Sequence, residues 1–435
     1  MASVTSANMF DYQPLTDENE IRLITLHPSS QPDDIVRCDI GHYVLSDLYH
    51  TSPYHDSLLS VNNSSTFSPS QERSEWLGFS QGQQQQDLGE DWVDVGPLVD
   101  DATKHLPLFR YTWGDYLALS YTWGGLSETR EIIVNGKSMR ITVNLARALR
   151  VLRDKQYIKD GWKLWIDALC INQQDIKERA TQVKRMRQIY SKAWSPIVWL
   201  GLSNDEDDSA LELVRTLATT YDIPDAVSSI TTTLRRDPKA YGDGSWRALH
   251  NLMTRHYWRR AWILQEASLG RNDMPVLCGD QTISWVDVHR AFWLINKSDE
   301  IVNIYITNEV EGSGAKLDIA IWNSMFVVGE IHKLQDEQIA KHAVNLYRVM
   351  SLSRNVFATD PRDKIYGLLA MMDESLTRNI MPDYLAPVRS VYIDFAKDTI
   401  EDTKSLELLR HTSSYGTLDL PSWVPDWTAE HMTSS

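Results

Sequence analysis

The stretch 162–201 constrains the fold most, because its pattern fixes the order strand, helix, strand. Residues 162–166 form a short apolar run that is typical of a buried strand. Asp175 with Glu178 three residues later predicts a capping box at the start of a helix, and Pro196 prevents that helix from continuing. Two strands joined by a helix are expected to be parallel and to form a right-handed crossover. The stretch therefore predicts an α/β sheet.

The helix expected between these strands has two different faces. Apolar residues recur at intervals of three and four and predict the buried face, whereas basic residues fill the opposite face. The apolar set is Ile176, Ala180, Val183, Ile189 and Ala193, and the basic set is Lys177, Arg179, Lys184, Arg185 and Arg187.

Further elements surround this unit. Residues 116–121 (YLALSY) predict a buried strand, and 144–156 predict an amphipathic helix. Asn135-Gly136 between two β-prone runs predicts a hairpin, and 276–285 predicts another. The alternation of strands and helices favours a parallel sheet flanked by helices.

Composition defines four regions in the chain. We expect an N-terminal strand pair in 1–47, a disordered Ser/Gln/Asp-rich insertion in 48–106, an α/β domain in 107–275 and a mainly helical region in 276–435. At 435 residues and 42% hydrophobic composition, the chain can bury more than one domain.

Charge, cysteines and hydropathy exclude several functional classes. A net charge of −16 argues against binding to nucleic acid, which relies on clustered Lys and Arg. Cys38, Cys170 and Cys278 are widely spaced, so they predict neither a disulfide framework nor a zinc site, and they favour a reducing compartment. The N-terminus lacks the pattern of a secretory signal, and no apolar run reaches eighteen residues. We expect a cytoplasmic protein without a membrane span or a bound metal.

Three sequence blocks carry a family resemblance. YLALSYTWG at 116–124, LWIDALCINQQDIKERATQVKRMRQIYSKAWSPIVWLG at 164–201 and RRAWILQE at 259–266 together resemble the fungal heterokaryon incompatibility (HET) domain. DPRDKIYGLLAM from Asp360 and LPSWVPDWT from Leu420 resemble segments that commonly follow that domain. Against this pattern the sequence ends early, so we expect that a further C-terminal region is missing.

The resemblance implies a role in fungal non-self recognition and programmed cell death. HET domains are similar to Toll/interleukin-1 receptor (TIR) domains, which implies a TIR-like (flavodoxin-like) parallel sheet flanked by helices. We expect this sheet together with the N-terminal strand pair and the α-rich C-terminal region described above. Some TIR domains are NAD glycohydrolases that use the glutamate of a Trp-x-x-x-Glu segment. NAD is therefore a candidate substrate, and we expect no cofactor. The alternative is a non-catalytic module that self-assembles or recruits cell-death signalling proteins. Under that alternative, the basic face of the helix predicted between the two strands binds another copy of the domain. The structural alternative is that this basic face is only exposed to solvent.

Glu266 is the candidate catalytic residue under the resemblance. Trp262 lies four residues earlier, on the same face of a helix, where its indole could wall a pocket. A carboxylate beside the ribose would stabilise the positive charge that develops when the nicotinamide bond breaks. The structural alternative is that Trp262 belongs to the core and that Glu266 pairs with Arg259 or Arg260.

Candidate substrate-binding residues follow the first two parallel strands. Ser120, Tyr121, Trp123 and Gly124 come at the end of the 116–121 strand, where a glycine turn lets backbone N–H groups approach a phosphate. The alternative is an aromatic turn that only packs the edge of the sheet. Asp167 follows the next strand and could bind a ribose or orient the Trp123 loop, or it could cap the following turn.

Overall fold

The described part of the structure covers most of the ordered elements that the sequence predicts. The computed structural model describes residues 9–31, 34–45, 67–74, 115–125, 127–237, 239–242, 244–302, 319–339, 346–354, 356–372, 377, 380–412 and 418–429. The predicted insertion 48–106 lies outside the described residues apart from 67–74.

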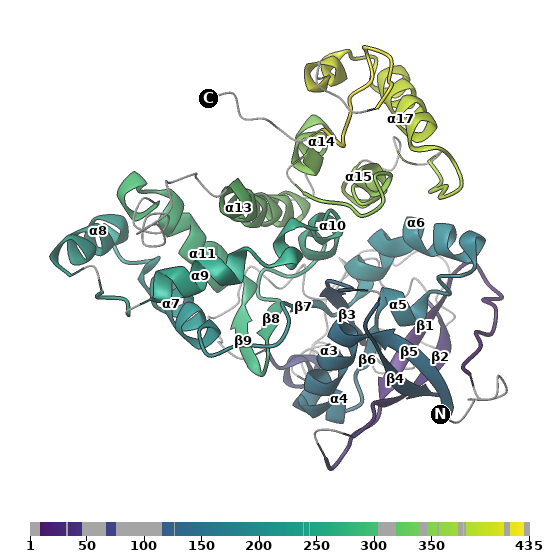
Figure 1. Ribbon diagram of the computed structural model, residues 1–435, viewed down its shortest axis with the longest axis horizontal. Helices are drawn as coiled ribbons and strands as arrows, with labels where there is room; N and C mark the ends of the chain where they lie inside the picture. Colours follow the sequence, from purple (N-terminus) through teal and green to yellow (C-terminus); the bar gives the residue numbers. More distant parts are fainter. Residues whose placement is uncertain are drawn as a thin grey trace, which may run out of the picture.

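The helices and strands alternate along the central part of the chain (Figure 1). The strands are β1 Glu20–Leu26, β2 Arg37–Val44, β3 Tyr116–Tyr121, β4 Thr129–Val134, β5 Lys137–Thr142, β6 Lys163–Trp165, β7 Ser195–Trp199, β8 Pro275–Cys278 and β9 Gln281–Ser284. The first group of helices is α3 Val143–Asp154, α4 Gln156–Lys159, α5 Asp167–Cys170, α6 Ile176–Lys192, α7 Asp207–Thr220, α8 Ala226–Arg236, α9 Ser245–Met253, η4 His256–Arg259 and α10 Trp262–Ser268. The second group is α11 Trp285–Asn296, α13 Ile319–Ile339, α14 Leu346–Arg354, α15 Asp363–Tyr366, η5 Leu369–Met371, α17 Val388–Thr403 and η6 Glu407–His411.

The predicted α/β class is confirmed, but the sheet is mixed. In the described residues the strand order is β5-β4-β2-β1-β6-β3-β7-β8-β9. Its inner part, β6-β3-β7-β8, is parallel, and the pairs β1–β2, β1–β6, β4–β5 and β8–β9 are antiparallel. Counted along the chain, the parallel strands stand in the order second, first, third, fourth, which is the order of flavodoxin-like sheets.

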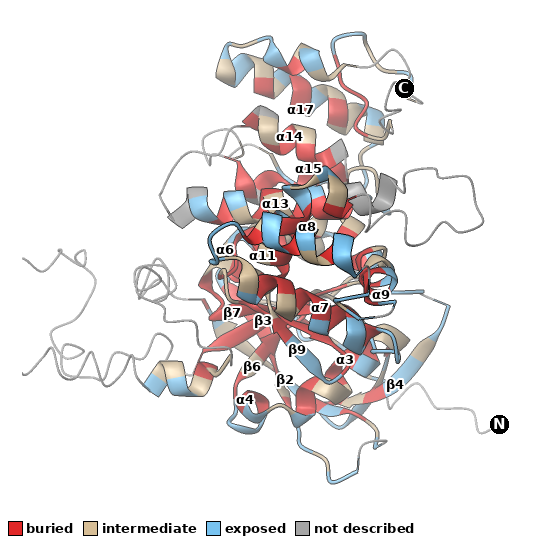
Figure 2. Ribbon diagram, turned by 90° about the vertical axis from the view of Figure 1, so that its left-hand side faces the viewer, coloured by how far each residue is buried: buried red, intermediate tan, exposed pale blue. Residues whose placement is uncertain are grey.

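This order places helices on both faces of the parallel strands. The chain moves from β3 to β6 in one direction and from β6 back past β3 to β7 in the other. Because both crossovers are expected to be right-handed, α3 and α4 pack on one face and α6 on the opposite face. Figure 1 shows this separation. The strands β3, β7 and β8 are buried along their whole length (Figure 2).

The predicted N-terminal strand pair is confirmed, and it is built into the sheet. β1 and β2 are antiparallel to each other, with Ile24 of β1 opposite Leu164 of β6. On the other side, β2 runs parallel to β4, with Cys38 opposite Val134. The pair therefore joins the parallel strands to the β4–β5 hairpin.

The predicted hairpin at Asn135-Gly136 is confirmed. Both residues have positive φ, 49° and 76°, as a type I′ turn requires. The Asn135 side chain also accepts a hydrogen bond from the Ile40 N–H at 2.8 Å and donates to the Ile40 carbonyl at 3.1 Å. The turn residue thus fastens the hairpin to β2.

The start of α6 differs from the predicted capping box in one respect. Asp175 caps the helix as predicted, because its carboxylate accepts from the N–H groups of Lys177 and Glu178. Glu178 does not reach back to Asp175; its carboxylate accepts from both terminal nitrogens of Arg22, at 2.5 and 2.9 Å. The predicted apolar face is also only partly correct, since Ile176 is 41% exposed.

The described hydrophobic residues form two cores. One core contains the strands from β1 to β7 with α3 and α6, and the other contains α7 to α11 with the C-terminal helices. Trp262 packs against both cores. The predicted α-rich C-terminal region is confirmed. Within the described residues, no helix is long and apolar enough to cross a membrane.

The buried pair between Arg22 and Glu178 gives a test of this architecture. The two side chains are 1% and 9% exposed, so Glu178→Ala would leave the Arg22 charge buried without its acidic partner. We expect the free energy of unfolding to fall by about 3–5 kcal/mol in urea titrations. Glu212→Ala, which removes an exposed partner of Arg215, is the control and should change it by less than about 0.5 kcal/mol. Equal effects would contradict the buried pairing.

Candidate functional site

The candidate site lies at the carboxyl ends of the parallel strands. Ser120 and Tyr121 end β3, and Asp167 follows β6. Because the connection after β3 covers one face of the sheet and the connection after β6 covers the other, this edge contains the switch point at which doubly wound sheets bind ligands. The α10 helix lies beside β3 and β7 and brings Glu266 to the same place.

Ser120 and Glu266 form the centre of the site. The Ser120 hydroxyl donates to the Glu266 carboxylate at 2.5 Å and lies 2.9 Å from the hydroxyl of Tyr257 on η4. The Arg260 guanidinium lies 3.5 Å from the same Glu266 oxygen and donates to the Tyr121 carbonyl. The site thus consists of a carboxylate held by a hydroxyl on one side and a cation on the other.

Burial controls the protonation of Glu266. Its side chain is 3% exposed, whereas that of Arg260 is 18% exposed. Burial raises the pKa of Glu266 to about 7, Arg260 and the Ser120 hydrogen bond oppose the rise, and Asp167 adds to it. A carboxylate with a pKa near neutrality in a polar cluster is a common feature of functional sites.

Asp167 forms the second carboxylate of the site. It accepts from the Trp123 indole N–H at 2.8 Å and from the Ala168 N–H at 2.7 Å. It therefore orients the Trp123 loop, one of the roles that the sequence left open, and as the first residue of α5 it also binds the N–H of the next residue; the N-cap of α5 is Ile166. Burial raises the pKa of Asp167, and the Arg260 guanidinium opposes that rise. Arg260 thus acts electrostatically on both carboxylates.

The turn after β3 is held in place by α3. Gly124 has φ +80°, and a Cβ there would lie 3.3 Å from the Cβ of Asn144. The Asn144 side chain donates to the Thr122 carbonyl at 2.6 Å and accepts from the Trp199 indole at 3.0 Å. Glycine is therefore favoured at this turn by both its conformation and its surroundings.

Trp262 pairs with a carboxylate that is not part of the polar cluster. Its indole N–H donates to Asp363 of α15 at 3.1 Å, and the Tyr384 hydroxyl donates to the other oxygen of Asp363 at 2.8 Å. The structure therefore places Trp262 at the junction with the C-terminal region. The packing of Trp262 against both cores fits the alternative that it belongs to the core, and its role as a pocket wall beside Glu266 stays a prediction.

Neither Tyr257 nor the shared role of Arg260 is predicted by the sequence. Arg260 was considered only as a structural partner of Glu266, and its proximity to the Glu266 carboxylate is confirmed. Tyr257 gave no signal, because it lies in the 3₁₀ turn η4, outside the strand ends and sequence blocks from which the site was predicted. Together these groups can bind an anion through Arg260 and present a carboxylate to a developing positive charge.

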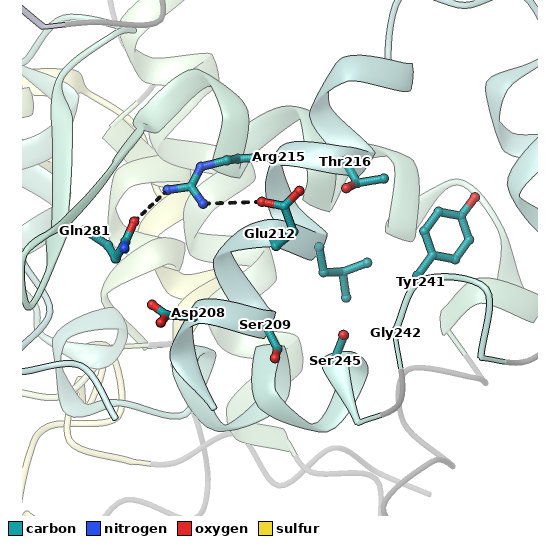
Figure 3. A pocket seen from close by; sticks show the side chains of 10 residues that line it. Asp208, Ser209, Glu212, Arg215, Thr216, Tyr241, Gly242, Ser245 and Gln281 are labelled. Atoms are coloured by element: carbon teal, nitrogen blue, oxygen red, sulfur yellow. Dashed lines mark hydrogen bonds and ion pairs between the residues drawn. The ribbon is translucent and has the colours of Figure 1, made fainter. Parts of the chain in front are cut away.

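A polar hollow of 530 Å³ lies elsewhere, over α7 and β9 (Figure 3). It shares no residue with the Glu266 cluster. Figure 3 shows Arg215 between Gln281 and Glu212, at 3.3 and 3.6 Å, so these polar groups already pair with one another. The hollow is therefore not the candidate site.

Comparison with known proteins identifies the region that contains the site. Residues 116–266 match the family described as heterokaryon incompatibility protein (HET). The chain contains a HET domain. The matched range of this domain includes Ser120, Asp167 and Arg260 and ends at Glu266. The HET resemblance found in the three sequence blocks is thus confirmed.

A curated relative extends the similarity beyond the HET domain. The chain is 28% identical over 375 residues to "Heterokaryon incompatibility protein 6, OR allele" of Neurospora crassa. This alignment covers 72% of the chain and 53% of the relative, so the chain spans about half the length of that protein. No solved structure matches the chain, and the similarity of the HET domain to TIR domains remains a prediction.

The raised pKa of Glu266 predicts a pH dependence of stability. Between its ordinary value of 4.5 and about 7, the folded protein holds a proton that the unfolded chain has released. The contribution of Glu266 to stability is therefore fully present below pH 4.5 and is lost as the pH rises through about 7, so this group should lower the free energy of unfolding by up to about 1.4 kcal/mol per pH unit across the range. Urea titrations at pH 5, 6, 7 and 8 should show this slope relative to Glu266→Gln. Parallel profiles for the two proteins would contradict the raised pKa.

Proposed function

We propose that the chain is a cytoplasmic heterokaryon incompatibility protein, an effector of fungal non-self recognition and programmed cell death, whose HET domain cleaves NAD. The family match and the Neurospora crassa relative support the incompatibility role. The observation that carries the proposed chemistry is the buried Glu266 carboxylate beside Ser120 and Arg260, at the switch point of the sheet.

The proposed reaction is hydrolysis of the bond between nicotinamide and ribose. The bond between C1′ and the ring nitrogen breaks, its electron pair leaves with nicotinamide, and positive charge develops on the ribose. Ionised Glu266 stabilises that charge. Water then adds to C1′ and loses a proton, which gives ADP-ribose. Because Glu266 acts as the anion, the rate should rise with pH through its pKa of about 7.

Arg260 is suited to the anionic part of the substrate. It is the more exposed member of the pair with Glu266, so a ligand entering from solvent would meet its guanidinium first. Guanidinium groups bind phosphate oxygens in pairs. Binding of a pyrophosphate would draw Arg260 toward the ligand and free the Glu266 carboxylate for the ribose.

The proposal predicts that NAD cleavage depends on Glu266. Purified protein at high concentration should release nicotinamide, and Glu266→Ala should lower the rate about 100-fold or more, because the group that stabilises the transition state is lost. Glu330→Ala is the matched control, because Glu330 is also buried and paired, with Lys333 and Arg348, outside the site. Circular dichroism checks that all variants are folded.

Two results would overturn the catalytic proposal. One is an absence of nicotinamide release by folded wild-type protein, including protein tethered into oligomers. The other is release that Glu266→Ala leaves unchanged. Either result would favour the alternative function, a non-catalytic module that self-assembles or recruits cell-death partners.

Contacts of the basic α6 face bear on that alternative. The Arg179 guanidinium lies 3.9 Å from the centroid of the Tyr384 ring, and Arg187 donates to the Met372 carbonyl at 3.0 Å. The face that sequence analysis considered for docking is thus partly covered by the C-terminal region of the same chain. Assembly through α6 would require that region to move away.

Cell death provides the test that separates the two functions in vivo. Expression of the wild-type chain in a fungal host should reduce viability, and Glu266→Ala, at equal protein level, should restore it if death requires catalysis. Viability counts with immunoblots measure both quantities. Retained toxicity of Glu266→Ala would contradict the catalytic route.

A further inference from the structure

A short segment of the predicted insertion is docked on the sheet. Residues 67–74 are described, and 69–74 are helical; they appear as the short purple helix near α4 in Figure 1. The segment crosses the amino ends of the parallel strands. Its partners Asp115, Trp162 and Trp194 come directly before β3, β6 and β7.

Apolar contacts hold the first residues of the segment. The Phe67 ring packs edge-on against Tyr157 of α4 at a centroid distance of 5.7 Å, and the Arg271 guanidinium lies 5.7 Å from the same ring. Pro69 is buried. Phe67 therefore lies between an aromatic ring of α4 and the guanidinium of Arg271.

Polar contacts hold the middle of the segment. Glu72 accepts from the buried Arg271 at 2.7 Å and from the Trp194 indole at 3.0 Å. Ser70 donates to Asp160 at 2.5 Å and accepts from the Trp162 indole at 3.1 Å. Charged and neutral side chains of one continuous segment therefore meet matching partners on the domain.

The last charged residue completes this pattern. The Arg73 guanidinium lies 3.6 Å from the Asp115 carboxylate and 5.6 Å from the centroid of the Trp162 ring. Within segment 67–74, the Glu72 carboxylate pairs with Arg271 and the Arg73 guanidinium pairs with Asp115. These two ion pairs fix the direction of the segment along the edge of the sheet. Such a contact resembles recognition of a short linear peptide.

The chain on either side of the segment is long. Residues 46–66 separate it from β2, and residues 75–114 separate it from β3. Fully extended, stretches of about 20 and 40 residues reach at most roughly 70 and 140 Å, which is long compared with the radius of gyration of roughly 22 Å that is expected for a compact chain of this length. The segment can therefore reach the same edge of a second copy without unfolding the sheet.

We propose that residues 67–74 form an exchangeable clip, which binds the amino edge of its own sheet in the monomer and that of a second copy in an assembled form. Exchange replaces each contact with an identical one, so it costs little free energy beyond the entropy of association. The surface is distinct from the Glu266 cluster, because it lies at the opposite ends of the same strands. The proposal therefore stands independently of NAD cleavage.

Cross-linking between two single-cysteine chains tests the exchange. Full-length Ser70→Cys is mixed with differently tagged full-length Asp160→Cys and treated with a short bismaleimide. The native cysteines Cys38, Cys170 and Cys278 are buried and stay unreactive. We expect a covalent heterodimer, because only a clip bound to the other copy brings these two positions together. The yield should rise with protein concentration.

Controls define what each outcome means. Ser209→Cys, an exposed position on α7, replaces Ser70→Cys to measure random collisions. The double variant Ser70→Cys with Asp160→Cys in one chain should cross-link internally. Internal linkage without a heterodimer would overturn the exchange, as would an equal yield with Ser209→Cys. A double variant that does not cross-link would overturn the docking itself.

Discussion

The burial of two carboxylates around one guanidinium is the constraint on which the rest of the HET domain depends. Glu266 and Asp167 come from α10 and from the turn after β6, and Arg260 lies near enough to affect the pKa of each. A buried charge without a partner costs several kcal/mol, so these elements must meet in one arrangement. The η4–α10 segment therefore has to pack at the carboxyl edge of β3, where both cores also meet at Trp262.

Local patterns of the sequence predicted the elements whose structure is decided locally. The β3 strand, the Asn135-Gly136 hairpin and the α6 helix follow from periodicity, turn residues and capping, and all three are confirmed. The insertion of β1 between β2 and β6 could not be predicted in this way, because pairing between distant strands leaves no mark in a local pattern. The pairing of Glu178 with Arg22 was missed for the same reason.

The candidate site shows the same division. Ser120 and Asp167 were expected because polar residues after parallel strands gather at one edge of a sheet, and the structure places both there. Glu266 entered only through the family resemblance. The contact of Tyr257 with Ser120 depends on a break in the helix that periodicity could not locate. Trp262 shares a helical face with Glu266, yet its indole N–H donates to Asp363. Shared spacing therefore did not predict this contact.

The two ends of the parallel strands have different physical roles. At the carboxyl edge, charges are buried and constrained by one another, which is the fixed geometry that the proposed NAD cleavage would require. At the amino edge, the contacts of residues 67–74 come from one short segment on long connections, and Phe67 packs this segment against one core. The β3 and β7 strands run from one edge to the other. Within β3, the Leu119 carbonyl accepts a hydrogen bond from the Tyr190 hydroxyl of α6. A rigid sheet thus separates a fixed charge cluster from an exchangeable contact, and assembly at one edge can proceed without altering the other.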